Sequence, residues 1–246
     1  MDSSDMRFRL ITYNIHKGIG GIDRRYRPER IIETLAHYTP DIVLLQEVDE
    51  GVPRTNHHRQ VDLLGEALGL RHRAFQQNVK VKHGHYGNAI LSRFPLSDIH
   101  DIDLSVRWKK RRRALVAHCH LHTDEHSRTL LIYNMHLGLA GFERSIQLRK
   151  IIEHETLART HHRTAVIVAG DFNDVWGGLG KRLLEPADFQ SATGKIKTFP
   201  AFRPLRPLDR IYFRGDLNCH GSHASKVPVA RRASDHLPII AEFEIL

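Results

Sequence analysis

Cysteine, long apolar runs and acidic residues are all in short supply in this chain. Its two cysteines, Cys119 and Cys219, cannot build a disulfide framework, so a fold held together by several disulfides is excluded. No apolar run is long enough to cross a bilayer, and the first five residues are polar and acidic, unlike a secretory signal peptide. These features lead us to expect a protein of the reducing cytoplasm.

The shortage of acids leaves a strongly basic chain. Lys and Arg number 37 against 28 Asp and Glu, which gives a formal net charge of +9 at pH 7. This excess favours anionic partners, either phosphodiesters or membrane headgroups, without discriminating between them. No low-complexity tract or linker divides the chain, so we expect residues 1–246 to form a single domain with its own core. No feature predicts an obligate protein partner.

The chain carries an internal repeat. Residues 13–18 and 133–138 both read Tyr-Asn, an apolar residue, His, any residue, Gly. Each copy is followed by a helical stretch and then by an apolar strand that ends in an acid, Glu47 in the first half and Asp171 in the second. The repeat predicts that the two halves fold as two similar layers.

Polar side chains follow the apolar strands in both halves. In open α/β sheets, ligands bind just past the carboxyl ends of strands. If the two halves meet face to face, Asn14 and Glu47 of the first half approach Asn134, His136 and Asp171 of the second. We therefore expect a polar cluster at one end of the stacked sheets, although the segment after residue 170, taken alone, is equally compatible with a turn.

Apolar periodicity predicts alternating strands and helices along the whole chain. Pro28 is well placed to open the first helix, and glycines make residues 174–180 a loop. The expected helices cover residues 28–38, 63–68 and 145–159. The expected strands cover residues 7–15, 41–47, 86–93, 115–121, 128–136, 165–171 and 208–213 and a last segment through Ile245, with a polar turn at 123–127.

Six short motifs occur in an order that resembles one known superfamily. They are Asn14, Gln46–Glu47, Asn134–Met135–His136–Leu137, Gly170–Asp171–Phe172–Asn173, Leu208–Asp209–Arg210–Ile211 and Ser234–Asp235–His236. Each is weak alone, but six in register resemble the endonuclease/exonuclease/phosphatase superfamily, which includes deoxyribonuclease I and neutral sphingomyelinases. The resemblance implies a DNase I-like α/β fold, a four-layer sandwich of two mixed β-sheets flanked by helices.

A divalent cation is the cofactor that the resemblance implies. Mg²⁺, with Mn²⁺ as the alternative ion, takes oxygen ligands and needs only one or two protein carboxylates. Glu47 is the predicted ligand, with Asn14 as its neighbour and Asp235 as an addition from the far end of the chain. The ion would polarise the scissile phosphate and neutralise charge on the leaving oxygen. Whether one ion or two act stays open.

The resemblance also implies catalytic roles for five side chains. Asp171 orients or deprotonates the attacking water, and Asn173 holds a phosphoryl oxygen. His236, held by Asp209, and His136 contribute hydrogen bonds or a proton to the phosphate. A histidine beside a carboxylate stays protonated to higher pH, which suits a phosphate contact.

Three further residues are predicted to bind the substrate phosphate, each with a structural alternative. Arg113 is the last residue of the cationic run 108–113. The structural alternative for this run is a solvated loop with one or two arginines turned inward. Asn134 alternatively satisfies backbone groups at a strand end. Tyr86 is alternatively an aromatic at the edge of the core.

The sequence thus predicts a Mg²⁺-dependent phosphoesterase that hydrolyses phosphodiester bonds of nucleic acid or of a phospholipid headgroup. Residues 14–18, 86–92 and 198–200 resemble a bacterial branch of metal-dependent hydrolases, nearer to neutral sphingomyelinases than to abasic-site endonucleases. The cationic run suits a nucleic-acid backbone or an anionic membrane surface with Trp108 at the interface. The rival from another class is a non-catalytic basic module that binds nucleic acid or anionic membrane.

Overall fold

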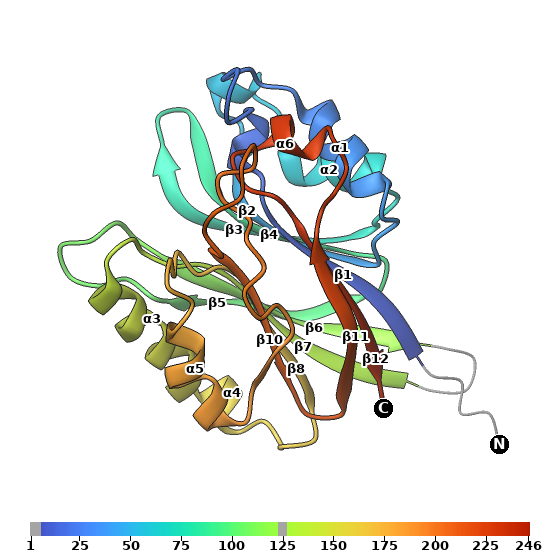
Figure 1. Ribbon diagram of the computed structural model, residues 1–246, viewed down its shortest axis with the longest axis vertical. Coiled ribbons are helices and arrows are strands. Elements are labelled where there is room, and N and C mark those ends of the chain that lie inside the picture. Colours follow the sequence, from blue (N-terminus) through green and yellow to red (C-terminus); the bar gives the residue numbers. More distant parts are fainter. Residues whose placement is uncertain (1–5, 123–126) are drawn as a thin grey trace.

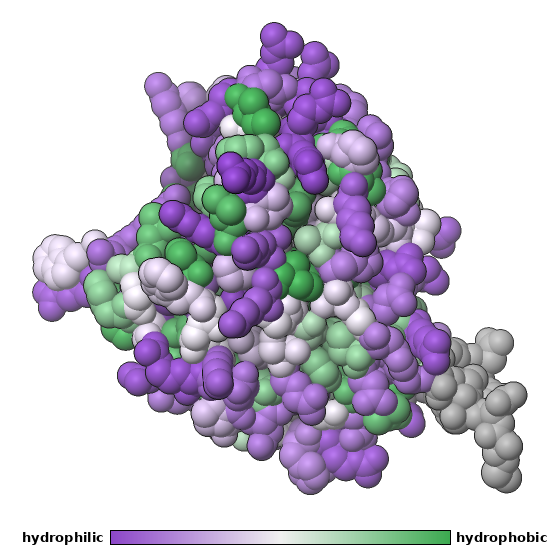
Figure 2. All heavy atoms as spheres, in the orientation of Figure 1, coloured by the Kyte–Doolittle hydropathy of each residue, from purple (hydrophilic) through white to green (hydrophobic). Residues whose placement is uncertain are grey.

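The computed structural model describes residues 6–122 and 127–246, and it consists of two β-sheets packed face to face with helices on the outside (Figure 1). Each sheet has six strands. Hydrophilic side chains cover much of the face in view, with hydrophobic ones among them (Figure 2). None of the helices in the described ranges is long and apolar enough to span a membrane. The predicted four-layer α/β sandwich of two mixed sheets is confirmed.

The elements have the following bounds. The first sheet contains β1 (Met6–Asn14), β2 (Ile42–Glu50), β3 (His72–Val81), β4 (Gly84–Ser92), β11 (Leu217–Ala224) and β12 (Ile239–Ile245). The second contains β5 (Leu96–Asp103), β6 (Arg113–His122), β7 (Ser127–His136), β8 (Ala165–Asp171), β9 (Gln190–Ser191) and β10 (Asp209–Arg214). The helices are α1 (Pro28–Ala36), α2 (Gln60–Ala67), α3 (Gly141–Glu153), α4 (Glu155–Ala158), α5 (Leu179–Leu183) and α6 (Ala230–Ala233), with short 3-10 turns η1 (His16–Gly18), η2 (Pro53–Thr55) and η3 (Glu185–Ala187).

The two sheets share one strand order. The first runs β11-β12-β1-β2-β4-β3 and the second β5-β6-β7-β8-β10-β9, so each strand has a counterpart in the other sheet. In each sheet the central pair, β1–β2 or β7–β8, is parallel and its neighbours are antiparallel. The repeat seen in the sequence therefore corresponds to the two sheets, and the parallel pairs place the carboxyl ends of four strands at one edge of the molecule.

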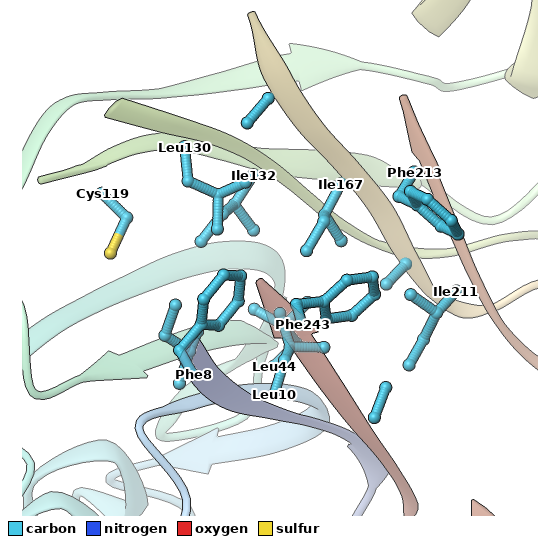
Figure 3. Packing of buried hydrophobic residues seen from close by; sticks show 14 of the residues in the cluster. Phe8, Leu10, Leu44, Cys119, Leu130, Ile132, Ile167, Ile211, Phe213 and Phe243 are labelled. Carbon is cyan, nitrogen blue, oxygen red and sulfur yellow. The ribbon is translucent and has the colours of Figure 1, made fainter. Parts of the chain in front are cut away.

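The largest hydrophobic cluster fills the space between the sheets (Figure 3). Strand alternation explains it, because Leu115 and Ala117 of β6 face the other sheet whereas Val116 between them faces the helices. Phe243 of β12 stacks on Phe8 at 5.6 Å between ring centroids and meets Phe213 of the second sheet edge-on at 5.4 Å. Separate clusters pack α1 and α2 on the first sheet and α3, α4 and α5 on the second.

The strands that the sequence did not predict are β3, β5, β9 and β11. All four are edge strands. Edge strands have one solvated side and carry fewer buried apolar residues, so their periodicity is weak. Several boundaries also differ by a few residues. The helix expected over 145–159 begins at Gly141 and is divided at His154, which has an extended ψ of 137°, and β2 continues past Glu47 to Glu50. Most of the turn expected at 123–127 lies outside the described residues.

A buried amide on β7 links the two sheets. Asn134 is fully buried, and its Nδ2 donates to the carbonyl oxygens of Leu45 at 2.9 Å and Ala89 at 2.8 Å, both in the first sheet. Its Oδ1 accepts a hydrogen bond of 2.8 Å from Gln46 Nε2. Both amide hydrogens are thus used within the core. Asn134 is therefore a link between sheets, as its structural alternative anticipated, rather than the phosphate contact that we expected.

We expect Asn134→Ala to lower the free energy of unfolding by about 2–4 kcal/mol, because the carbonyls of Leu45 and Ala89 would lose a buried donor and Gln46 would lose its acceptor on the second sheet. Urea denaturation measures this loss. Asn218→Ala, at an exposed position of β11, is the matched control and should change stability by less than about 0.5 kcal/mol. Equal effects of the two substitutions would contradict the linking role.

Candidate active site

Polar side chains from both sheets meet at the edge where the parallel strands end. Asn14 is the last residue of β1, His136 of β7 and Asp171 of β8. Asp171 pairs with His136 across β7–β8 and with Asp209, the first residue of β10, across β8–β10. The strand register therefore sets three of these side chains next to one another before any loop contributes.

The carboxylate of Asp171 lies at the centre of this cluster. Its Oδ2 accepts a hydrogen bond of 3.0 Å from Asn14 Nδ2, and its Oδ1 accepts one of 2.9 Å from the backbone N–H of Asn173. The Nε2 atoms of His136 and His236 lie 3.4 Å and 3.8 Å from Oδ2. Asp171 is 1% exposed, so these four residues define its position.

His236 is held by Asp209. Its Nδ1 donates to Asp209 Oδ2 at 2.8 Å, and the same oxygen accepts the Thr198 hydroxyl. Burial lowers the pKa of His236, but the charges of Asp209 and Asp171 outweigh burial and raise this pKa to about 10. His236 is therefore a protonated imidazole at neutral pH, with Nε2 directed toward Asp171.

His136 has the opposite character. Burial and the nearby Arg112 guanidinium lower the pKa of His136 to about 4, although Asp171 and Glu47 act in the other direction. Its Nδ1 lies 4.0 Å from Glu47 Oε1 and has no hydrogen-bond partner among the described residues. We expected His136 to contribute hydrogen bonds or a proton to the phosphate. The structure indicates a neutral imidazole at pH 7, because burial next to a cation outweighs two carboxylates.

Glu47 lies in a bulge of β2 with a positive φ of 58°. Burial opposes its charge, but His136 and the Lys17 ammonium lower its pKa well below the ordinary range. At neutral pH, where His136 is uncharged, the Lys17 ammonium is the cation that pairs with the Glu47 carboxylate. Burial and the charge of the Glu47 carboxylate raise the pKa of Tyr86.

Three cations surround Tyr86 and Glu47. Lys17 Nζ and Lys110 Nζ lie 5.5 Å and 5.0 Å from the centroid of the Tyr86 ring. Arg112 is 5% exposed, and its Nε and Nη1 have no hydrogen-bond partner within the described ranges. Glu47 neutralises only one of these charges, so the arrangement has a surplus of positive charge and is suited to an anion.

Residues 11–236 match the sequence model of the Endonuclease/Exonuclease/phosphatase family. The chain belongs to this family. It is 30% identical over 259 residues to the uncharacterized protein YbhP of Escherichia coli K12, a match that covers 97% of this chain and 96% of YbhP.

Solved structures share the fold of this family member. An endonuclease/exonuclease/phosphatase from Beutenbergia cavernae has a TM-score of 0.81 and 22% identity, covering 98% of this chain and 72% of that one. A mannosyl-6-phosphatase from Bacteroides thetaiotaomicron has a TM-score of 0.74 and 19% identity, covering 96% and 99%.

Two residues predicted for the family site make no hydrogen bond or ion pair with Asp171 or Glu47 among the described residues. Arg113 makes an ion pair of 3.1 Å with Asp101 on β5 and is partly exposed. Its neighbour Arg112, which precedes β6, is the arginine that turns inward. Adjacent residues of an extended chain face opposite sides, so an error of one residue in the predicted arginine selects the outward-facing side chain. Asp235 is half-buried, accepts a hydrogen bond of 3.3 Å from Ser234 Oγ, and lines a hollow together with Ile22.

The donor set fits the divalent ion that the family implies. Glu47 is ionised, 16% exposed and already paired with a cation, and its oxygens suit Mg²⁺ or Mn²⁺. Asp171, Asp209 and His236 also have donor atoms within 4.8 Å of one another. However, a protonated His236 bound to Asp209 has no lone pair to offer, so Glu47, which lies near Nδ1 of His136 whereas Asp171 lies near its Nε2, is the better ligand.

Sequence reasoning missed Lys17, Lys110, Arg112 and Thr198 as individual site residues. A signal existed for Lys17, because the matching position of the repeat is the apolar Leu137. Lys110 and Arg112 belong to the cationic run, in which nothing distinguishes inward from outward side chains. Thr198 lies 11 residues before Asp209, to which its hydroxyl donates, and carries no local signal.

Imidazole NMR titration of the metal-free protein should separate the two histidines. We expect His236 to stay protonated until about pH 10 and His136 to be neutral above about pH 4. Because folding raises the pKa of His236, its pairing with Asp209 stabilises the fold fully below pH 6.5. This stabilisation is lost as the pH rises through about 10.

The substitution Asp209→Asn should lower the pKa of His236, whereas Asp101→Asn, which removes a remote partner of Arg113, should leave it unchanged. Titration of both histidines near the ordinary 6.5 in the native protein would refute this assignment.

Proposed function

We propose that this protein is a metal-dependent phosphoesterase that cleaves phosphodiester bonds, either of nucleic acid or of a phospholipid headgroup. The observation that carries the proposal is the position of Asp171, whose carboxylate lies within 3.8 Å of one protonated and one neutral imidazole. Ionised Glu47 and a surplus of cations complete the group. Membership of a family named for nucleases and phosphatases supports phosphoester chemistry.

Each side chain has a distinct task in this proposal. A Mg²⁺ or Mn²⁺ ion held by Glu47, beside Asn14, would polarise a phosphate oxygen and offset its charge. Asp171, which Asn14 and the Asn173 backbone hold in one orientation, positions the attacking water and accepts its proton. Protonated His236 donates from Nε2 to a phosphate oxygen, since its Nδ1 is bound to Asp209.

Two further groups contact the phosphate in the proposed complex. Asn173 Nδ2 donates one hydrogen to the Leu137 carbonyl at 2.9 Å, which leaves its second hydrogen for a phosphoryl oxygen. Arg112 is buried close to His136, and its Nε and Nη1 have no hydrogen-bond partner in the part of the chain that the structure describes, so it offers a charged fork to the same group. Tyr86, kept neutral by its raised pKa, forms the wall between them and Lys110.

Two hollows, each lined by residues close in sequence to the cluster, favour a diester. A hollow of about 470 Å³ is lined by Phe142, Trp176 and Asp174, which follows Asp171 by three residues. A second, of about 240 Å³, is lined by Phe202 and by Asp235, the neighbour of His236. A phosphate bound between the two hollows would have room for a substituent on either oxygen. The similarity to a mannosyl-6-phosphatase makes a monoester the comparison substrate.

Hydrolysis of bis(p-nitrophenyl) phosphate tests the proposal directly. We expect turnover with Mg²⁺ or Mn²⁺, none with EDTA, and less with p-nitrophenyl phosphate. Glu47→Gln should lower kcat/KM by roughly 100-fold because the carboxylate ligand is lost. His236→Ala should lower kcat by about 10²–10⁴-fold, the usual contribution of a positioned proton donor.

The matched controls are Glu66→Gln and His162→Ala, which alter exposed side chains. Full activity in both site variants would end the assignment. Salt-sensitive binding of nucleic acid or anionic vesicles by wild type, without turnover of any phosphoester, would instead establish the rival non-catalytic module.

Neighbouring arginines give the sharpest comparison. Arg112→Ala should lower kcat/KM roughly 10- to 100-fold, because it removes a charge-assisted hydrogen bond to the phosphate. Arg113→Ala removes a partly exposed ion pair with Asp101 and should have little effect. Steady-state kinetics on the same diester measures both, and the reverse order would show that Arg113 is the phosphate contact after all.

A further inference from the structure

Exposed hydrophobic side chains gather at the edge of the molecule that holds the candidate active site. Ten large hydrophobic residues are exposed among the described residues, and seven of them lie at this edge. Trp108 and Trp176 are 88% and 90% exposed. Large apolar side chains in water without a partner, concentrated around one site, indicate a surface that another body covers.

The topology places these residues together. Ile22 follows β1, Leu139 and Phe142 follow β7, and Trp176 follows β8, so all four come after carboxyl ends of parallel strands. Trp108 precedes β6, whose first residues pair with the last residues of β7. In Figure 1 the β5–β6 connection that carries it projects furthest to the left, beyond α3.

The β9–β10 connection completes this edge. It carries the exposed Phe202 and Leu205 and leads into Asp209, which pairs with Asp171 at the end of β8. Phe202 and Ile22 line one hollow. Phe142 and Trp176 line the other, and Lys109 Nζ lies 5.3 Å from the Phe142 ring centroid, which joins the β5–β6 connection to this side.

Two of these connections carry charge of one sign only. The β5–β6 connection exposes Arg107, Lys109 and Arg111 and contains no acid between residues 104 and 112. The β9–β10 connection exposes Arg203 and Arg206, and residues 199–208 likewise contain no acid. Figure 2 shows hydrophobic and hydrophilic side chains mixed on the left of the molecule, where the β5–β6 connection lies.

We propose that these connections form a docking surface for an anionic lipid bilayer, with the site facing the headgroups. Tryptophans at the level of the headgroups, hydrophobic side chains below them and flanking cations are the combination that holds proteins on anionic membranes. Nucleic acid fits less well, because Ile22, Leu139 and Leu205 have no aromatic face on which a base could stack. This binding does not depend on turnover.

Intrinsic fluorescence tests the proposal in the unaltered protein, because Trp108 and Trp176 are its only tryptophans and both are exposed. In EDTA, vesicles of phosphatidylglycerol and phosphatidylcholine in equal parts should shift the emission to shorter wavelength, and brominated acyl chains should quench it. Vesicles of phosphatidylcholine alone should bind more weakly. Unshifted emission with anionic vesicles would overturn the proposal.

Variants then locate the surface by vesicle sedimentation. Trp108→Asn with Phe202→Ser should weaken binding roughly tenfold or more, because two inserted side chains are lost. Asn suits the positive φ of 67° at position 108. Ile99→Ser alters an exposed hydrophobic residue on the edge strand β5, away from these connections, and should bind like wild type. Equal loss in both variants, or none in either, would contradict the proposed surface.

Charge-reversal variants test the role of the cations. Lys109→Glu with Arg111→Glu should abolish the preference for anionic vesicles, whereas Arg159→Glu, at an exposed position just after α4, should not. A labelled single-stranded DNA oligonucleotide tests the other class of polyanion. If the DNA quenches both tryptophans while vesicles leave them unchanged, this edge binds nucleic acid and the membrane proposal is wrong.

Discussion

The hydrogen bond from Asn14 Nδ2 to Asp171 Oδ2 crosses from one sheet to the other and joins the two halves of the candidate site. It depends on the alignment of two parallel strand pairs, which the buried amides of Asn134 and Gln46 maintain just beneath it. A slip of one residue in either pair would turn alternate side chains to the opposite face and separate the polar groups. The packing of the sheets is therefore a condition for the chemistry.

The same packing sets the electrostatics of the site. Two buried histidines lie against one carboxylate, yet His236 is charged and His136 is neutral, because the first has Asp209 behind it and the second has Arg112 nearby. Neighbours thus assign opposite protonation states to chemically identical side chains. With Glu47 ionised beside Lys17, the site combines a protonated imidazole, an anionic carboxylate and cationic side chains within one small volume.

The site and the proposed docking surface share one edge for a topological reason. The strands of each parallel pair end at this edge, and their antiparallel neighbours begin there. The connections after the former and before the latter therefore lie next to the polar cluster. The core clusters lie between the layers and are closed to solvent. Substitutions in the connections change what the molecule contacts without changing what holds it together.

Local pattern alone determined the repeat, the two similar halves and the central strands, because buried strands are marked by continuous apolar residues and their ends by Asn14, Glu47 and Asp171. The four-layer sandwich was implied by the resemblance to the superfamily. It did not reveal the edge strands, whose solvated sides weaken the pattern. Only the tertiary structure decided that Arg112 rather than Arg113 turns inward and that Asn134 links the sheets. Those outcomes depend on partners tens of residues away along the chain, and a side chain's surroundings, not its type, decide whether it bears charge, bridges layers or meets a ligand.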